Sequence, residues 1–336
     1  MNRRPVRKTY SIDRRQAGSV KVGPVFVNLR CEAMTKKLLP RVAVGGFILI
    51  AVLGAALILS SAKPPPPLPN PNGYDDFVKA GCMLTGSAGD PATTSLEDLR
   101  AEVARNASTL GLARMGLERP CRVPLEYSEN FYSRHAGDLA AIKRLAQAFY
   151  AEGKLAEREG RDAEAVHAYL ENIQLGQESA RGGLLIDRLV GLACEAFGCA
   201  GLNSVVGQLG AAECRTAIRR LEAMEASDAP GETVEALFQR ERAFHRRAYG
   251  WRGQFDEVLA FFRFRDLRLV RQQLRQKTEA GQMRLQRLLV DLAARAYERD
   301  QGQRPKSVAD LVPDYLKAIP QDPMSGTNRA NLPQSP

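Results

Sequence analysis

The stretch from Gly137 to Ser179, GDLAAIKRLAQAFYAEGKLAEREGRDAEAVHAYLENIQLGQES, decides the fold class. Its apolar residues recur every three or four positions, which is the period of an amphipathic helix. Gly160 interrupts this pattern, and glycine is the residue that most readily follows the end of a helix. We therefore predict two helices, Gly137–Arg158 and Arg161–Ser179, which pack together as a hairpin.

Three residues of this hairpin have a spacing that resembles a tetratricopeptide unit. Gly153 and Ala165 are small, and the aromatic Tyr169 follows four positions after Ala165. In such a unit small residues let two helices cross closely, while an aromatic ring fills the gap. The sequence contains one clear copy, whereas a stacked repeat needs about three. We predict a tetratricopeptide-like hairpin within a larger bundle, with peptide binding as a secondary hypothesis.

The helical period continues on both sides of the hairpin, and no stretch alternates long enough to predict a sheet. Ser95 and Asp98 have the spacing of a capping box at the start of a helix. Residues 116–133 contain Pro120 and Pro124 and are predicted to form a loop. The prediction is an all-α multi-helix bundle. Its further helices are expected at Asp75–Leu84, from Ser95 onward, and at Gly182–Gly201, Ala211–Ala226, Glu232–Tyr249 and Gln254–Arg299.

The segment Val42–Ala62, VAVGGFILIAVLGAALILSSA, contains no charged residue. At about 1.5 Å per residue, a helix of this length spans about 30 Å, the thickness of the hydrocarbon core of a bilayer. We predict one N-terminal transmembrane helix here. A cleaved signal peptide is the alternative, because Ser60 and Ala62 have the spacing of a signal-peptidase site.

Basic residues are concentrated just before this segment. The chain has 48 Lys and Arg against 38 Asp and Glu, and residues 1–41 hold 11 of the former and two of the latter. Residues 63–336 therefore carry a net charge of only +1, which gives no ground for a nucleic-acid partner. By the positive-inside rule, the N-terminal tail is cytoplasmic and the C-terminal domain lies outside. Translation from Met1 and from Met34 both stay open.

The residues that follow, Lys63–Gly73, are rich in proline. Consecutive prolines cannot continue a helix and favour an extended, stiff spacer; a ligand for a proline-recognising domain is the alternative. The predicted organisation has five parts. They are a disordered basic tail at 1–41, the transmembrane helix at 42–62, the spacer at 63–73, a helical extracytoplasmic domain at 74–326 and a disordered tail at 327–336.

Residue patterns typical of enzymes are scarce. The three histidines, His135, His167 and His245, belong to no catalytic or metal-binding motif. Glu241 lies four positions before His245, so the two side chains can meet on a helix. Four arginines surround them, which favours a solvated, salt-bridged face.

A second acidic feature interrupts the apolar helix predicted at Gly182–Gly201. Asp187 and Glu195 lie with Gly191 on one stripe, spaced four residues apart. We interpret this stripe as the water-facing edge of a buried helix, with Arg188 as an ion-pair partner. Acid–base catalysis by the two carboxylates is the alternative.

The cysteine spacing supports no zinc site, because no two cysteines form a C-x-x-C pair. A Cys82–Cys121 disulfide and free buried thiols are both open. From these patterns we assign no catalytic residue, no cofactor-binding residue and no metal ligand, and we expect no cofactor.

Residues 263–287 hold eight basic side chains against Asp266 and Glu279, with phenylalanines just before and among them. Interleaved basic and aromatic residues are typical of single-stranded nucleic-acid binding. Because the predicted domain lies outside the membrane, we expect no nucleic-acid partner. A solvated helix face or contact with anionic headgroups is the interpretation that we favour.

The segment Arg304–Gly326, RPKSVADLVPDYLKAIPQDPMSG, combines a capping box at Ser307 with an apolar stripe up to Ile319. It predicts a helix that Pro320 stops. The segment resembles the closing segment of type II secretion pseudopilins, and residues 46–50 resemble the start of their prepilin cleavage site. The chain departs from that family at Ala51, where pseudopilins have a glutamate, and it lacks the acidic calcium ligands expected after the Asp-Pro turn.

A wider resemblance covers Pro71–Gly326. It is carried by the residues Pro71–Phe77, Glu164–Leu170 and Arg181–Asp187 and by the Pro-x-Ser-x-x-Asp-Leu-Val-Pro pattern at 305–313. These resemble a family of uncharacterised bacterial single-pass membrane proteins with a Pro-rich spacer, a helical extracytoplasmic domain and a pseudopilin-like C-terminal segment. The resemblance implies architecture and a bacterial envelope setting, and it implies no activity.

The sequence thus predicts a non-catalytic protein anchored by a single pass in the bacterial inner membrane. Its helical domain is expected to bind or scaffold other proteins, so the expected partners are the membrane and an unidentified protein. A component of a type II secretion or pilus-like machine is one alternative. A membrane-anchored hydrolase with an unrecognised site is the other.

Overall fold

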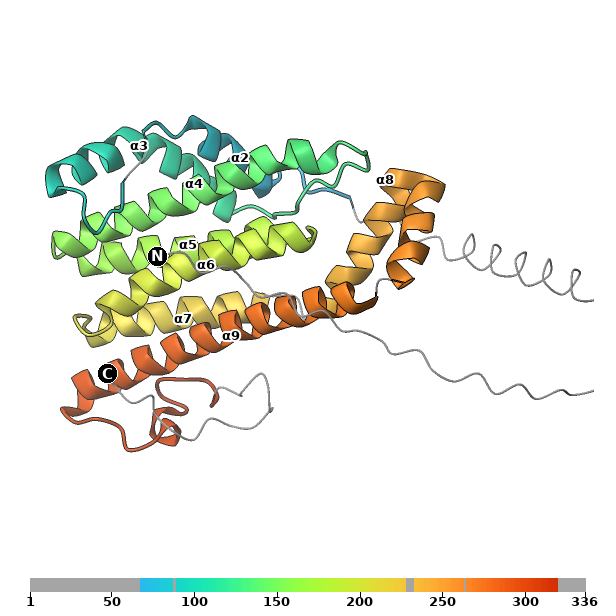
Figure 1. Ribbon diagram of the computed structural model, residues 1–336. Coiled ribbons are helices and arrows are strands. Elements are labelled where there is room, and N and C mark those ends of the chain that lie inside the picture. Colours follow the sequence, from blue (N-terminus) through green and yellow to red (C-terminus); the bar gives the residue numbers. More distant parts are fainter. Residues whose placement is uncertain (1–66, 87–88, 228–232, 263, 320–336) are drawn as a thin grey trace, which may run out of the picture. The chain divides into compact units, whose positions relative to one another are not determined.

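The computed structural model describes residues 67–86, 89–227, 233–262 and 264–319. These residues form eight α-helices and one 3-10 helix and contain no strand, which confirms the predicted all-α bundle (Figure 1). The predicted transmembrane helix at 42–62 and both predicted tails lie outside the described residues. Within the described part, no helix is long and apolar enough to cross a membrane.

Most helix ends lie close to their predicted places because local signals set them. Gly160 has a φ of 71°, a left-handed conformation that glycine adopts without strain, and it separates the two hairpin helices as expected. The Ser95 side chain accepts a hydrogen bond from the Asp98 N–H, as the capping box predicts. The helices are α2 Gly73–Met83, α3 Leu96–Leu117, α4 Phe131–Arg158, α5 Asp162–Ala180, α6 Leu185–Val205, α7 Ala211–Ser227, α8 Val234–Phe262 and α9 Phe264–Gln301.

Several predicted boundaries differ from the structure, and two of the differences are large. Helix α4 begins at Phe131, six residues before the predicted start at Gly137. The predicted break before Gln254 is present as a kink inside α8, because the backbone at Gly250 (φ 57°, ψ −133°) is not helical. The helical path resumes after this kink, and α9 begins only at Phe264.

The predicted C-terminal helix is wrong beyond its first turn. Only Val308–Leu311 are helical, as a single 3-10 turn. Pro313 has no N–H to continue the helix and holds the preceding Val312 in an extended conformation (φ −107°, ψ 135°). The apolar side chains of Val308, Leu311 and Leu316 are nevertheless buried, and they extend the core across α7 and α9.

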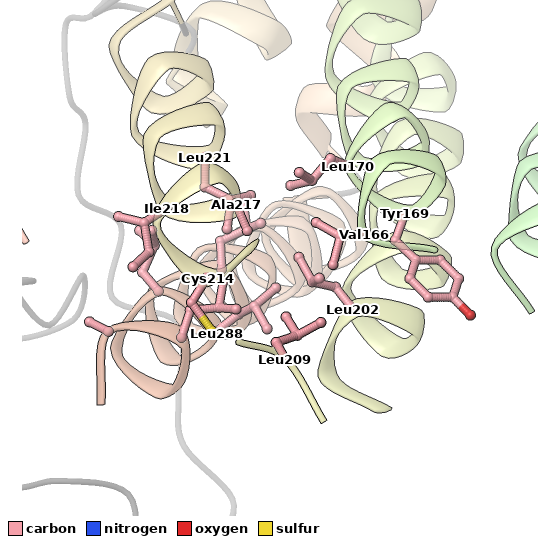
Figure 2. Close-up of a cluster of buried hydrophobic side chains, with 14 of the residues drawn as sticks. Val166, Tyr169, Leu170, Leu202, Leu209, Cys214, Ala217, Ile218, Leu221 and Leu288 are labelled. Carbon is pink, nitrogen blue, oxygen red and sulfur yellow. The ribbon is translucent and has the colours of Figure 1, made fainter. Parts of the chain in front are cut away.

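Helix α5 lies at the centre of the bundle and packs against α4 and α6. The main hydrophobic cluster joins α5 and α6 to α7 and α9, and Figure 2 shows its side chains converging between these helices. The Tyr169 ring of α5 fills the space beside Gly153 of α4 and Gly201 of α6, where an added Cβ would overlap it. The contact predicted between Gly153 and Tyr169 is therefore present in the hairpin.

Candidate functional site

Helix α6 carries the acidic pair that the sequence singles out, but its orientation is the reverse of the prediction. Asp187 and Glu195 are only 1% and 3% exposed, so the interpretation as a water-facing edge is wrong. Ile186, Ala193 and Ala200, which lie seven positions apart, are exposed, as are Asn203 and Ser204 near the end of the helix. The reversal has a physical reason, because each buried carboxylate has a partner inside the bundle.

The partner of Asp187 is His135 of α4. Its Nε2 lies 2.6 Å from Asp187 Oδ1, and its Nδ1 lies 3.5 Å from Asp138 Oδ2. The second oxygen of Asp187 accepts a hydrogen bond from the Leu184 N–H at 2.6 Å, which caps the N-terminus of α6. The Phe131 ring stacks on the imidazole with a centroid distance of 4.6 Å.

The charge state of His135 follows from this environment. Burial alone would lower the pKa of the imidazole, because it penalises the charged form. The hydrogen bond and the charge of Asp187, together with Asp138, outweigh burial and raise the pKa above its ordinary value. His135 and Asp187 therefore form a buried hydrogen-bonded pair between α4 and α6, and this environment favours the protonated form of His135.

Glu241 of α8 is the second carboxylate at this end of α6. Its Oε2 accepts the Leu185 N–H at 3.0 Å, and its Oε1 accepts the Tyr132 hydroxyl at 2.5 Å. His245 approaches it as predicted, with 3.7 Å between Nε2 and Oε1. Burial raises the pKa of Glu241, but hydrogen bonds from His245, Leu185 and Tyr132 outweigh it and lower the pKa. The predicted solvated face holds for His245 and not for Glu241.

These contacts form one structural unit, which we call the α6 pin: His135, Asp187, Glu241 and Tyr132. A general base needs a free nitrogen or oxygen that can reach a substrate. Both imidazole nitrogens of His135 face carboxylates, and both oxygens of Asp187 and of Glu241 accept hydrogen bonds. The α6 pin therefore holds α4, α6 and α8 together.

Glu195 is the remaining member of the acidic pair. It forms the predicted ion pair with Arg188, at 2.8 Å between Nη1 and Oε1. The neighbouring thiols of Cys194 and Cys199 are buried, and burial followed by the charge of Glu195 raises the pKa of each to about 12. A protonated thiol is a poor nucleophile and a poor metal ligand.

The remaining described cysteines are also free thiols. The structure contains no Cys82–Cys121 disulfide, since Cys82 is exposed and Cys121 is buried and both are unbridged. Of the two alternatives that the sequence left open, buried free thiols therefore describe Cys121, Cys194, Cys199 and Cys214.

An ion-pair network around the buried Glu171, which the sequence did not point to, joins α3, α4 and α5. Arg114 donates to Glu171 at 2.8 Å and to Glu152 at 2.6 Å, and His167 lies 3.1 Å from Glu171. Burial raises the pKa of Glu171, but the bonds from His167 and Arg114 outweigh it and lower the pKa. The only signal for this network in the sequence is the position of Glu171 between the apolar residues of α5.

A groove lies where α6 passes α9. It has a volume of about 260 Å³ and is lined by Cys199, Ala200 and Asn203 from α6 and by Arg284, Arg287 and Leu288 from α9. Arg284 forms no ion pair with any described residue, and Arg287 lies 3.8 Å from Asp291. An apolar floor with two guanidinium groups at its side suits a segment that carries a carboxylate.

Within the described residues, no three His, Cys, Asp or Glu side chains form a group that could hold a metal ion. Among the described residues, the α6–α9 groove combines an open surface with the guanidinium of Arg284, which has no ion-pair partner there, and it joins the exposed stripe of α6. No family model, no curated protein and no solved structure matches the chain.

Proposed function

We propose that the chain is a non-catalytic envelope protein, anchored by residues 42–62, whose helical domain binds another protein through α6 and the α6–α9 groove. The observation that carries this proposal is the reversed orientation of α6. The carboxylates of Asp187 and Glu195 pair with side chains inside the bundle. The apolar side chains of Ile186, Ala193 and Ala200 face solvent. Apolar side chains that gather on an exposed face are common in interaction surfaces.

The stripe and the groove together define the chemistry of the partner. A seven-residue spacing is the spacing at which one helix meets another along a straight seam. The small side chains of Ala193 and Ala200 let a partner helix approach closely, and Ile186 supplies a larger contact at one end. Arg284 and Arg287 at the other end favour acidic residues. The expected partner segment is therefore an amphipathic helix with acidic side chains.

Photo-crosslinking tests the position of this surface. With p-benzoylphenylalanine in place of Ala200, we expect one dominant crosslinked protein in native membranes, because the probe then lies in the groove. The matched control carries the same probe at Ala104, an exposed alanine of α3. Equal crosslinking from the two positions would contradict a specific surface on α6.

Charge reversal tests the acidic character of the partner. Arg284→Glu should weaken capture of the protein crosslinked at position 200 by about tenfold, because attraction to an acidic partner becomes repulsion. The matched control is Arg105→Glu on α3, which removes an exposed arginine that forms no ion pair with a described residue. A crosslinked partner whose capture is insensitive to Arg284→Glu would show that the groove does not select acidic side chains.

Alkaline extraction of membranes tests the anchor. The full-length chain should stay in the membrane pellet, because the 21-residue apolar segment is long enough to span the bilayer. Release into the soluble fraction would contradict the anchor and favour a cleaved signal peptide. An N-terminus that begins directly after Gly46 would instead support the secretion-machine alternative.

A further inference from the structure

The hairpin formed by α8 and α9 carries a charge of its own. Residues 234–301, which span α8 and α9, hold 15 basic and nine acidic side chains, a net charge of +6, whereas the rest of residues 63–336 carries −5. Although residues 63–336 are nearly neutral in total, net positive and net negative charge therefore lie on different parts of the domain. Opposite net charges on two parts of one domain orient it in the field of a charged surface.

The hairpin lies at the end of the bundle where the chain enters it. The entering residue Asn72 donates to the Arg122 carbonyl and accepts the Arg122 N–H, which fixes the start of α2 on the loop after α3. The Val123 N–H donates to the carbonyl of Arg181, at the turn between α5 and α6. Arg240 of α8 donates to the Gly183 carbonyl of that turn. Figure 1 shows α8 and the α5–α6 turn at the same end.

The chain that precedes this end is short. Five positions separate Ala62, the last residue of the proposed anchor, from Pro67, the first described residue. At about 3.1 Å per residue, an extended proline-rich spacer covers about 15 Å over that distance. If residues 42–62 span the membrane, this covalent limit keeps Pro67 within about 15 Å of the end of the span.

The described surface of the hairpin has the chemistry of a lipid interface. Leu269 and Val270 of α9 are 52% and 46% exposed, so two large apolar side chains face solvent in succession. Arg275 and Lys277 of the same helix are exposed and form no ion pair with a described residue. Apolar side chains that enter the headgroup region beside basic ones are typical of helices that bind a membrane surface.

We propose that the α8–α9 hairpin binds the anionic phospholipid headgroups of the membrane in which the chain is anchored. The proposal rests on the anchor proposed above and is independent of the protein-binding groove. It combines the net charge of the hairpin, its place at the chain-entry end and its exposed apolar pair. Each basic side chain near an anionic leaflet strengthens such contact by about fivefold.

The single tryptophan of the chain, Trp251, allows a direct test because it belongs to α8 and the proposed anchor contains none. Full-length protein is reconstituted into nanodiscs of phosphatidylcholine with about one third phosphatidylglycerol, a fraction that gives a clearly negative surface potential. We expect brominated phosphatidylcholine to quench Trp251 strongly in these discs. We expect weak quenching in discs of phosphatidylcholine alone, and a loss of quenching as salt screens the headgroups.

Neutralisation of the basic pair separates charge recognition from simple insertion. The double variant Arg275→Gln and Lys277→Gln should shift the contact equilibrium by about 30-fold toward the unbound state, which is measured as lost quenching. The matched control, Lys79→Gln and Arg105→Gln, removes the same charge from exposed positions of α2 and α3 and should leave quenching unchanged.

Four other outcomes would each contradict the headgroup proposal. A chain that is incorporated into anionic discs without Trp251 quenching overturns the headgroup contact and leaves the anchor intact. Quenching that is equal in neutral and anionic discs also overturns it, because contact would then be apolar. A chain that does not enter the discs overturns the anchor, and the headgroup proposal falls with it. Quenching that a soluble acidic protein or nucleic acid reverses, with lipid unable to compete, would assign the hairpin to that ligand.

Discussion

His135→Ala is expected to lower the free energy of unfolding by about 3 to 5 kcal/mol, the cost of removing one partner of a buried ion pair. The loss is large because Asp187 would stay 1% exposed beside an empty space, with its charge no longer balanced by an imidazolium 2.6 Å away. The measurement is urea unfolding of the full-length chain in detergent, followed by helical circular dichroism. The α6 pin as a whole would loosen, since Asp187 also caps α6.

Two control variants show whether the effect belongs to the pair. His245→Ala removes a half-exposed imidazole that lies 3.7 Å from Glu241, and it should cost less than about 1 kcal/mol. The double variant His135→Ala with Asp187→Ala should cost less than the sum of the two single variants, because it leaves no buried charge unpaired. Additive losses would contradict the coupling that the geometry implies.

The same pair predicts how stability depends on pH. The pKa of His135 is raised in the folded protein above the unfolded value of about 6.5, so the folded state binds this proton more tightly. The contribution to stability is fully present below the unfolded pKa and is lost as pH rises through the folded pKa. The wild-type chain should lose stability across that interval, and His135→Ala should lack this dependence. An unchanged pH profile in the variant would contradict a charged His135.

Local signals in the chain set several helix ends, whereas a contact between distant residues sets the orientation of α6. The start of α3, the end of α4 and the start of α5 were predictable because Ser95 and Gly160 act on their own neighbours in the chain. The periodicity of α6 also placed Asp187, Gly191 and Glu195 correctly on one stripe. It did not reveal that this stripe faces inward, because His135 is 52 positions away in sequence from Asp187. An ionisable partner from another helix reversed the orientation that polarity alone predicts.

The α6–α9 groove could not be predicted from the sequence, because it too depends on contacts between residues far apart in the chain. Its two basic residues, Arg284 and Arg287, were visible in the sequence only as part of a charged stretch of 25 positions, 263–287. Among the described arginines of the stretch, only these two line the groove, because α9 packs against α6 at Cys199 and Leu288. The C-terminal segment shows the opposite case, because Pro313 is a local signal that limits the helix and outweighs the apolar stripe around it.

Gly191→Ala is expected to destabilise the chain by about 2 to 3 kcal/mol, the cost of overpacking a well-filled interior. A Cβ at Gly191 would overlap the carbonyl oxygen of Gly176, and a Cβ at Gly176 would lie 2.5 Å from the carbonyl oxygen of Gly191. The two backbones of α5 and α6 thus meet directly, and neither neighbour is a flexible side chain that can move aside. The substitution must separate the central helix pair. Thermal and urea unfolding of the full-length chain measure the loss.

The opposite sign is expected for the same exchange at Gly111 of α3, where a Cβ would meet no atom within 4 Å. Gly111→Ala should stabilise the chain by about 0.5 to 1 kcal/mol, because alanine has less backbone entropy to lose in a helix. Helix propensity favours alanine equally at both positions, so the difference in sign isolates the helix crossing. Stabilisation by Gly191→Ala would mean that α5 and α6 do not cross at Gly176. The buried placement of Asp187 on the same stripe of α6 would then lose its geometric basis, because Gly191 and Asp187 face the interior together.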